Sequence, residues 1–193
     1  MEEKKIYNEQ DCVETGEGMH FAGRVILLHA ASLPEELRNA EHQLYFCVGG
    51  SGSIPNWIGN ELQAVSLIDG EFVRWNRSDI LGIARTETLS DRARLQLSQI
   101  RPMESEIPKV PEFFGYCFLP NGRYAAGVPL SDELEVWGYV DVQRAYQHKL
   151  MICDQDDCCV LEIIDGKIIY PTQEILEAHQ KEQEQNGGME LKQ

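Results

Sequence analysis

The segment from Cys153 to Cys159, which reads CDQDDCC, has the highest density of potentially reactive side chains in the sequence. Thiolates and carboxylates bind metals, but a zinc site usually shows a second ligand pair at a regular spacing. Neither a CxxC nor an HxxxH pair is present, and the segment lacks the glycine and the distal glutamate of a calcium-binding EF-hand loop. We therefore predict a polar turn between two strands, without a metal or another cofactor. Alternation along the second strand would bury one of Cys158 and Cys159 and leave the other as an exposed, reactive thiol.

A second candidate is the glycine-rich segment 49–53, which reads GGSGS and follows a strand-like run. Backbone N–H groups in such loops can bind anions, which makes Gly50, Ser51 and Gly52 candidate ligand-binding residues. The known motifs do not fit, because Pro55 replaces the third glycine of a dinucleotide fingerprint and Ser53 replaces the last glycine of a nucleophile elbow. A Walker A lysine is also missing. The pattern favours a mobile connecting loop over an anion-binding loop or a catalytic serine.

The third candidate combines two cations with an aromatic side chain: Arg74, Trp75 and Arg77. In proteins that bind single-stranded nucleic acid, aromatic rings stack on bases while arginines contact phosphates. The formal net charge of −15 opposes this interpretation, because it repels a polyanion at long range. We favour a solvated strand end with a partly buried Trp75.

No recognisable catalytic signature accompanies these candidates. The five histidines are scattered, and no residue is assigned a catalytic role on spacing alone. A Cys–His pair could still assemble in space, for example from His29 with Cys47 or Cys117, because such partners need not be close in sequence. The balance of these observations leans against an enzyme.

The elements that would position these residues are short strands and helices. Asp69-Gly70 and Asp165-Gly166 each lie between apolar runs, which is a strong signal for a β-hairpin with glycine at positive φ. Further strands are expected over 24–28, 43–48, 113–119, 123–128, 149–153 and 158–164. Helices are expected from a capping box at 32–35, over 88–100 with Leu89, Ala93, Leu97 and Ile100 buried, after a cap at Ser131 with Leu134, Trp137 and Val140 buried, and after Thr172.

These elements predict an α+β protein of small, mostly antiparallel sheets with short helices. Three prolines between 102 and 111 mark the best boundary between two subdomains. The expected organisation is a mobile acidic tail over 1–20, an α+β subdomain over 21–100, a proline-rich linker over 101–111, an acidic α+β subdomain over 112–185 and a disordered tail over 186–193.

Charge is distributed unevenly between the halves. Residues 130–165 contain nine acids and two bases, a net charge of −7, whereas residues 21–110 contain eleven acids and nine bases, a net charge of −2. The first residues lack the apolar stretch of a signal peptide and no run is long enough to span a bilayer, so we expect a cytoplasmic protein with reduced thiols. An acidic surface favours a basic protein partner, or mimicry of DNA toward such a partner, and disfavours nucleic acid and membrane.

Three segments also show a familiar combination: LYFCVGG over 44–50, IDGE over 68–71 and WNRSDILGIA over 75–84. In residues 21–85 the chain resembles uncharacterised accessory proteins carried on conjugative elements of anaerobic bacteria. The resemblance implies an accessory protein of a mobile element and brings no catalytic residue with it. We therefore expect a non-enzymatic interaction protein that uses the acidic surface. Nucleic-acid binding through Arg74, Trp75 and Arg77 is the second interpretation, and an enzyme with a spatially assembled site is the third.

Overall fold

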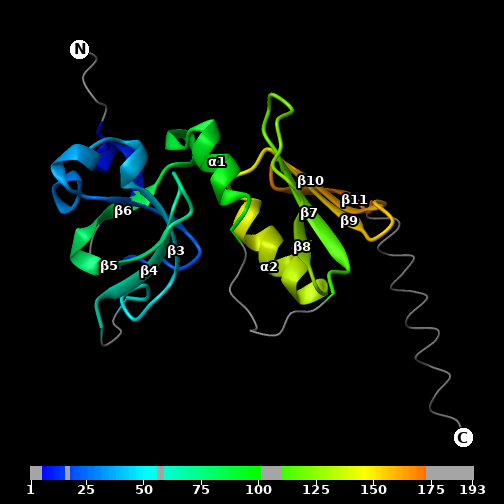
Figure 1. Cartoon of the computed structure of the whole chain (residues 1–193), viewed down its shortest axis with the longest axis horizontal. Helices are drawn as coiled ribbons and strands as arrows, with labels where there is room; N and C mark the ends of the chain where they lie inside the picture. The colour runs from blue at the N-terminus through cyan, green and yellow to red at the C-terminus, as the bar shows by residue number, and fades with distance from the viewer. Residues whose placement is uncertain (1–5, 16–17, 56–58, 101–109, 173–193) are drawn as a thin grey trace, which may run out of the picture.

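The computed structural model describes residues 6–15, 18–55, 59–100 and 110–172. It contains a six-stranded and a five-stranded antiparallel sheet with two α-helices between them (Figure 1). The expected α+β class with two small antiparallel subdomains is therefore confirmed. Among the described residues, neither helix has the length and apolar character that crossing a bilayer requires.

The first sheet has the strand order β1-β6-β2-β3-β4-β5. Its strands are β1 (Cys12–Glu14), β2 (Val25–Leu28), β3 (Leu44–Gly49), β4 (Glu61–Ser66), β5 (Phe72–Asn76) and β6 (Ile80–Ala84). Every residue of β2 is buried, because Val25 and Leu27 face one apolar cluster while Ile26 and Leu28 face another. A continuous apolar run is what a strand covered on both faces requires.

The second sheet has the order β11-β10-β9-β7-β8. Its strands are β7 (Phe113–Phe118), β8 (Val128–Leu130), β9 (Lys149–Asp154), β10 (Cys159–Ile164) and β11 (Lys167–Tyr170). Helix α2 (Glu133–Gln143) contacts β7, β8 and β9. The ring of Tyr139 lies on Gly115, where an added Cβ would stand 2.5 Å from the ring, so the helix packs directly on the backbone of β7.

Both Asp-Gly hairpins are confirmed. Ile164 pairs with Lys167, so Asp165 and Gly166 form a two-residue turn with φ values of 48° and 75°. Positive φ at both positions matches the type I′ turn that suits twisted strands. The first hairpin is longer, because the Ser66 N–H donates to the Glu71 carbonyl at 2.9 Å, and Gly70 has a φ of 78°.

The described part of segment 1–20 differs from the expected mobile tail. Strand β1 pairs with β6, and Tyr7 is buried. The Tyr7 N–H donates to the Gln43 side-chain oxygen at 2.8 Å, and the Tyr7 hydroxyl donates to the Thr88 carbonyl at 2.6 Å. The buried amide of Gln43 thus holds this segment in the first core, a contact between residues far apart in the sequence.

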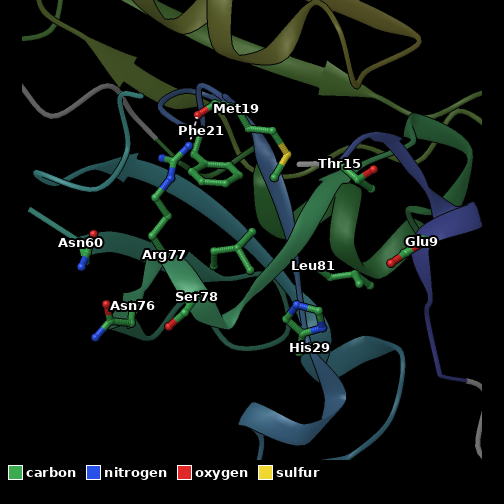
Figure 2. Close-up of a pocket in the computed structure, with 11 residues that line it drawn as sticks. Glu9, Thr15, Met19, Phe21, His29, Asn60, Asn76, Arg77, Ser78 and Leu81 are labelled. Carbon is green, nitrogen blue, oxygen red and sulfur yellow. Dashed lines mark hydrogen bonds between the residues drawn. The ribbon is translucent and has the colours of Figure 1, made fainter. Parts of the chain in front are cut away.

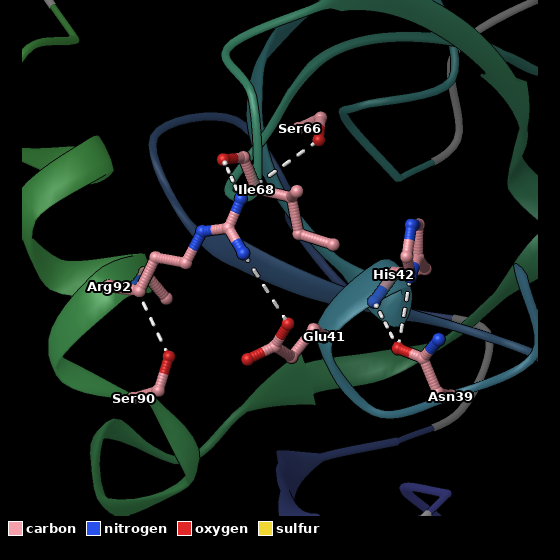
Figure 3. Close-up of polar contacts among 8 residues, drawn as sticks. Asn39, Glu41, His42, Ser66, Ile68, Ser90 and Arg92 are labelled. Carbon is pink, nitrogen blue, oxygen red and sulfur yellow. Dashed lines mark hydrogen bonds and ion pairs between the residues drawn. The ribbon is translucent and has the colours of Figure 1, made fainter. Parts of the chain in front are cut away.

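Helix α1 (Asp91–Leu97) is shorter than the predicted helix over 88–100. The four positions predicted as buried, Leu89, Ala93, Leu97 and Ile100, are nevertheless all buried. The Ser90 hydroxyl caps it by accepting from the Ala93 N–H at 3.2 Å (Figure 3). On its exposed side, Arg92 donates to the Ile68 carbonyl at 3.2 Å and lies 3.8 Å from the Glu41 carboxylate (Figure 3). Arg92 thereby connects α1 to the first Asp-Gly hairpin.

Helix α2 presents a different face to the core from the one predicted. Its cap is Asp132 rather than Ser131, and the buried side chains are Val136, Tyr139, Val140 and Gln143. Leu134 and Trp137, predicted as buried, are 70% and 48% exposed. The helix is rotated because Tyr139 and Gln143 turn toward α1 and bond its carbonyls.

Other predicted elements differ locally or lie outside the described residues. The capping box at 32–35 does not form, because the Ser32 hydroxyl donates to Asp79 instead and only 3-10 turns follow. Residues 123–128 contribute one bridge, from Tyr124 to Phe118, before β8 begins. The predicted helix after Thr172, the tail over 186–193 and most of the linker over 101–111 lie outside the described residues.

The two halves share a well-connected interface. Gln143 donates to the carbonyls of Leu97 at 2.6 Å and Ile100 at 3.3 Å, and the Tyr139 hydroxyl donates to the Ser98 carbonyl at 3.1 Å. Tyr146, from the second half, belongs to the buried cluster of the first sheet. These contacts place α1 against α2 between the sheets (Figure 1).

Candidate functional site

Among the candidates from the sequence, Arg77 and His29 line a cleft of about 630 Å³ (Figure 2). Arg77 lies in the 3-10 turn between β5 and β6. Its guanidinium donates to the carbonyls of Gly52 and of Met19, the latter at 2.6 Å, and it lies 4.5 Å above the Phe21 ring. The chain's own carbonyls and ring thus surround the Arg77 charge, which makes Arg77 a clamp between three loops.

The glycine-rich segment is packed rather than mobile. The Gly52 N–H donates to the Glu61 carbonyl at 2.8 Å, and the Ser53 N–H donates to the Gly50 carbonyl at 3.1 Å. Gly50 has a φ of 104°, and a Cβ there would collide with the Glu61 carbonyl. Because these two donors bind protein carbonyls, the N–H groups of Gly52 and Ser53 serve close backbone packing and are not available to an anion.

Arg74, Trp75 and Arg77 do not share one open face. Arg74 is exposed, with its Nε 3.7 Å from Glu61, whereas Trp75 points to the opposite face of β5 and packs edge-on against Tyr45 at a ring separation of 5.4 Å. The Trp75 indole N–H is buried without a hydrogen-bond partner among the described residues. The structure therefore brings Arg77 to Gly52 but separates Arg74 from Trp75.

All six thiols are free; Cys47 and Cys117 lie in separate buried clusters, whereas Cys153, Cys158 and Cys159 lie close together at the end of β9 and the start of β10. The Cys47 sulfur lies 3.6 Å from the Gly49 carbonyl in the first half of the chain. The Cys117 sulfur lies 3.0 Å from the Tyr139 hydroxyl in the second half. Neither thiol therefore forms a hydrogen-bonded pair with His29. Burial raises the pKa of Cys47 to about 11 and that of Cys117 to about 12, which keeps both as neutral thiols. Within the described residues, His, Cys, Asp and Glu side chains form no group that could hold a metal ion.

One histidine pair was missed by the sequence reasoning. His148 and Asp165 lie 2.7 Å apart through Nδ1 and a carboxylate oxygen, and both are exposed. The Asp165 N–H also donates to the His148 carbonyl at 2.8 Å. In a catalytic triad, a His–Asp pair of this kind has a serine or cysteine nucleophile on the other ring nitrogen. The adjoining cleft includes Thr86 but no serine or cysteine, so we assign the pair to the turn.

An apolar depression of about 450 Å³, here named the α2–β11 groove, lies between α2 and the end of the second sheet. It is lined by Phe113, Val136, Trp137, Val160, Leu161, Ile168, Pro171 and one acid, Glu133. Trp137 and Ile168 remain 48% and 47% exposed. Large apolar side chains gathered on a surface mark binding sites more often than scattered ones do.

Two features surround the α2–β11 groove. Strand β11 ends the sheet, so its outer edge has no neighbouring strand among the described residues. Acidic side chains lie nearby. Glu133 lines the groove, and Asp154 of β9 is the register partner of Phe113, another residue of the lining. The rotated face of α2, which sequence periodicity misassigned, is what exposes Trp137 here.

Comparisons with protein families, with curated proteins and with solved structures gave no match to this chain. The geometry of the candidate sites is therefore the basis for function.

Proposed function

We propose that this protein is a non-enzymatic interaction module whose α2–β11 groove binds a segment of a partner protein that carries an apolar anchor and basic residues. The observation that supports this proposal is that Trp137 and Ile168 both line the groove and are both half-exposed. Exposed tryptophans in apolar pockets are frequent energetic centres of interfaces.

The basic character of the partner follows from the surroundings of the groove. Residues 130–165 carry a net charge of −7, with Glu133 in the lining itself. Charges around an apolar site chiefly set the association rate and the choice of partner, and salt screens them over about 8–10 Å. Binding should therefore weaken as salt rises while retaining an apolar contribution.

The test is selection of short random peptides displayed on phage against the full chain, followed by affinity measurement of the enriched peptides. We expect enrichment of sequences with one large apolar residue beside lysine or arginine. Replacing the anchor in the groove, Trp137→Ala, should weaken binding by about 2 kcal/mol, which is roughly 30-fold.

Matched control variants are available for both sides of the groove. Leu134→Ala removes a more exposed side chain from the same helix outside the lining, and Ile169→Ser changes a residue as exposed as Ile168 in the same strand. These controls should bind the selected peptides with wild-type affinity, whereas Trp137→Ala and Ile168→Ser should bind them more weakly. Equal losses in variants and controls, or no enrichment of any peptide motif, would overturn the proposal.

The accessory role on a mobile element remains a prediction of the sequence resemblance. Nucleic-acid binding has less support, because Arg74 and Trp75 point to opposite faces of β5. Tight oligonucleotide binding that disappears in Trp75→Ala would reverse this ranking.

A further inference from the structure

Two cysteines stand directly opposite each other on neighbouring strands. Cys153 of β9 and Cys159 of β10 are register partners beside the turn 154–158. The Asp154 N–H donates to the Cys158 carbonyl at 2.9 Å, so the next pair, Cys153 with Cys159, is a non-hydrogen-bonded pair. Side chains at such a pair project to the same face of the sheet.

This arrangement matches the geometry of a disulfide. The Cα atoms of a non-hydrogen-bonded antiparallel pair lie about 4.5 Å apart, within the range of about 4.4–6.8 Å that a disulfide spans. The register alone therefore places the two backbones within the range that a disulfide can span. The Cys159 sulfur now lies 3.6 Å from the Leu161 carbonyl, so a rotation about χ1 would turn it toward Cys153.

We propose that Cys153 and Cys159 are a redox modification site that closes to a cross-strand disulfide when the protein meets a peroxide. Cys159 is half-buried and Cys153 is buried, so Cys159 is the thiol that the oxidant reaches first. The pair is independent of the proposed binding function, although it lies next to the bulge at Val160, which lines the α2–β11 groove.

The chemistry takes two steps. The Cys159 thiolate attacks hydrogen peroxide; an S–O bond forms, the O–O bond breaks, and the leaving hydroxide takes a proton to become water. The Cys153 sulfur then attacks the Cys159 sulfenic acid; the S–S bond forms, the S–O bond breaks, and hydroxide leaves with the Cys153 proton as a second water. Two thiols and one peroxide thus give one disulfide and two waters.

The acidic surroundings select the kind of oxidant. Asp154 and Asp157 lie close enough to raise the pKa of Cys153, after burial itself, and Glu162 acts similarly on Cys159. The raised pKa values slow the reaction of both thiols with any oxidant at neutral pH, and the nearby carboxylates in addition repel an anionic disulfide such as oxidised glutathione. A small neutral peroxide approaches without this repulsion.

Cys158 provides a matched control, since it is the exposed cysteine of the three. Its sulfur lies 3.8 Å from the Asp156 carbonyl within the turn, and Cys158 is not a register partner of Cys153. Exposure alone would select Cys158 as the oxidised residue, whereas register selects Cys153 and Cys159. Mapping which cysteines are oxidised distinguishes these two expectations.

The experiment treats the full native chain with hydrogen peroxide, blocks remaining thiols with N-ethylmaleimide and digests with a protease that cleaves before aspartate. Asp154, Asp156 and Asp157 separate Cys153 from the other two thiols, so a disulfide appears as two linked peptides in mass spectrometry. We expect Cys153 linked to Cys159, Cys158 carrying the label, and full release by dithiothreitol.

Variants make the assignment decisive. Cys158→Ser should form the same bridge at the same rate, and Cys153→Ala should leave Cys159 as a trappable sulfenic acid. A bridge between Cys158 and Cys159, a bridge between two chains, or three labelled thiols after peroxide treatment would each overturn the proposal. The wild-type mapping alone decides the question if a variant does not fold.

Discussion

Arg77 illustrates how a residue with the chemistry of a binding site can serve packing instead. Its guanidinium reaches Gly52 and Met19 and covers the Phe21 ring, which fastens the glycine-rich segment to the first sheet. The sequence shows that a cation and a glycine-rich loop exist. It does not show that the Arg77 guanidinium and the backbone N–H groups of Gly52 and Ser53 donate to the chain's own carbonyls.

The tight packing of that segment predicts a strong contrast between adjacent glycines. Gly50→Ala should lower the free energy of unfolding by about 2–3 kcal/mol, because it adds a Cβ at positive φ against the Glu61 carbonyl. Gly49→Ala, where nothing lies within 4 Å of the added atom, is the control and should change stability little. Urea denaturation followed by circular dichroism measures both; similar losses in the two variants would contradict this account.

At the scale of elements, signals encoded locally were predictable and those arising from distant contacts were not. The Asp-Gly turns and the spacing of Leu89, Ala93 and Leu97 depend on neighbouring residues, and they match the structure. The predicted buried face of α2 does not match the structure, because the buried positions include Gln143. This polar residue donates a hydrogen bond to α1 across 46 residues of sequence. Hydrophobic periodicity cannot identify a face built partly from polar side chains.

The same limit applies to the candidate site. The acidity of the second half was apparent from the sequence, but the α2–β11 groove depends on Trp137 being exposed on α2 beside β11. The sequence places Trp137 at a helical spacing that resembles a core position. The rotation of the helix that exposes it is set by the packing of Tyr139 on Gly115 together with the hydrogen bonds of Tyr139 and Gln143 to the end of α1.

The contact between α1 and α2 can be tested through Gln143. Gln143→Ala removes a buried amide that donates to the carbonyls of Leu97 and Ile100, and leaving these acceptors without a donor should cost about 2–3 kcal/mol. Gln99→Ala is the control, since its exposed amide makes only two long contacts of 3.4 Å, with the Ala126 carbonyl and with the hydroxyl of the neighbouring Ser98. The midpoint of urea unfolding should fall for the first variant and stay near wild type for the second.

For the whole molecule, the buried thiols predict how stability depends on pH. Cys47 and Cys117 lie in separate apolar clusters, and burial raises their pKa values from 9.0 to about 11 and to about 12. Above pH 9 the unfolded chain loses these protons while the folded chain keeps them, so the free energy of unfolding should fall as pH rises toward 11 and 12. Below pH 9 these two groups contribute no pH dependence.

The measurement is the midpoint of urea unfolding between about pH 8 and about pH 10.5, a range chosen to bracket the unfolded thiol pKa. The double variant Cys47→Ala/Cys117→Ala should show a shallower decline, while the exposed Cys158→Ala should follow wild type. An identical slope in all three proteins would assign the alkaline loss to other groups.

The completion of the first sheet by the second half also affects the order in which the protein can be made. Tyr146 fills the core around Val25. The Leu97 carbonyl at the end of α1 has its hydrogen-bond donor in Gln143, which is 46 residues further along the chain. At a synthesis rate of about 5–20 residues per second, the ribosome needs roughly 2–9 seconds to supply that residue after α1 is made. During this interval the nascent first half exposes apolar surface that only later-synthesised residues can cover.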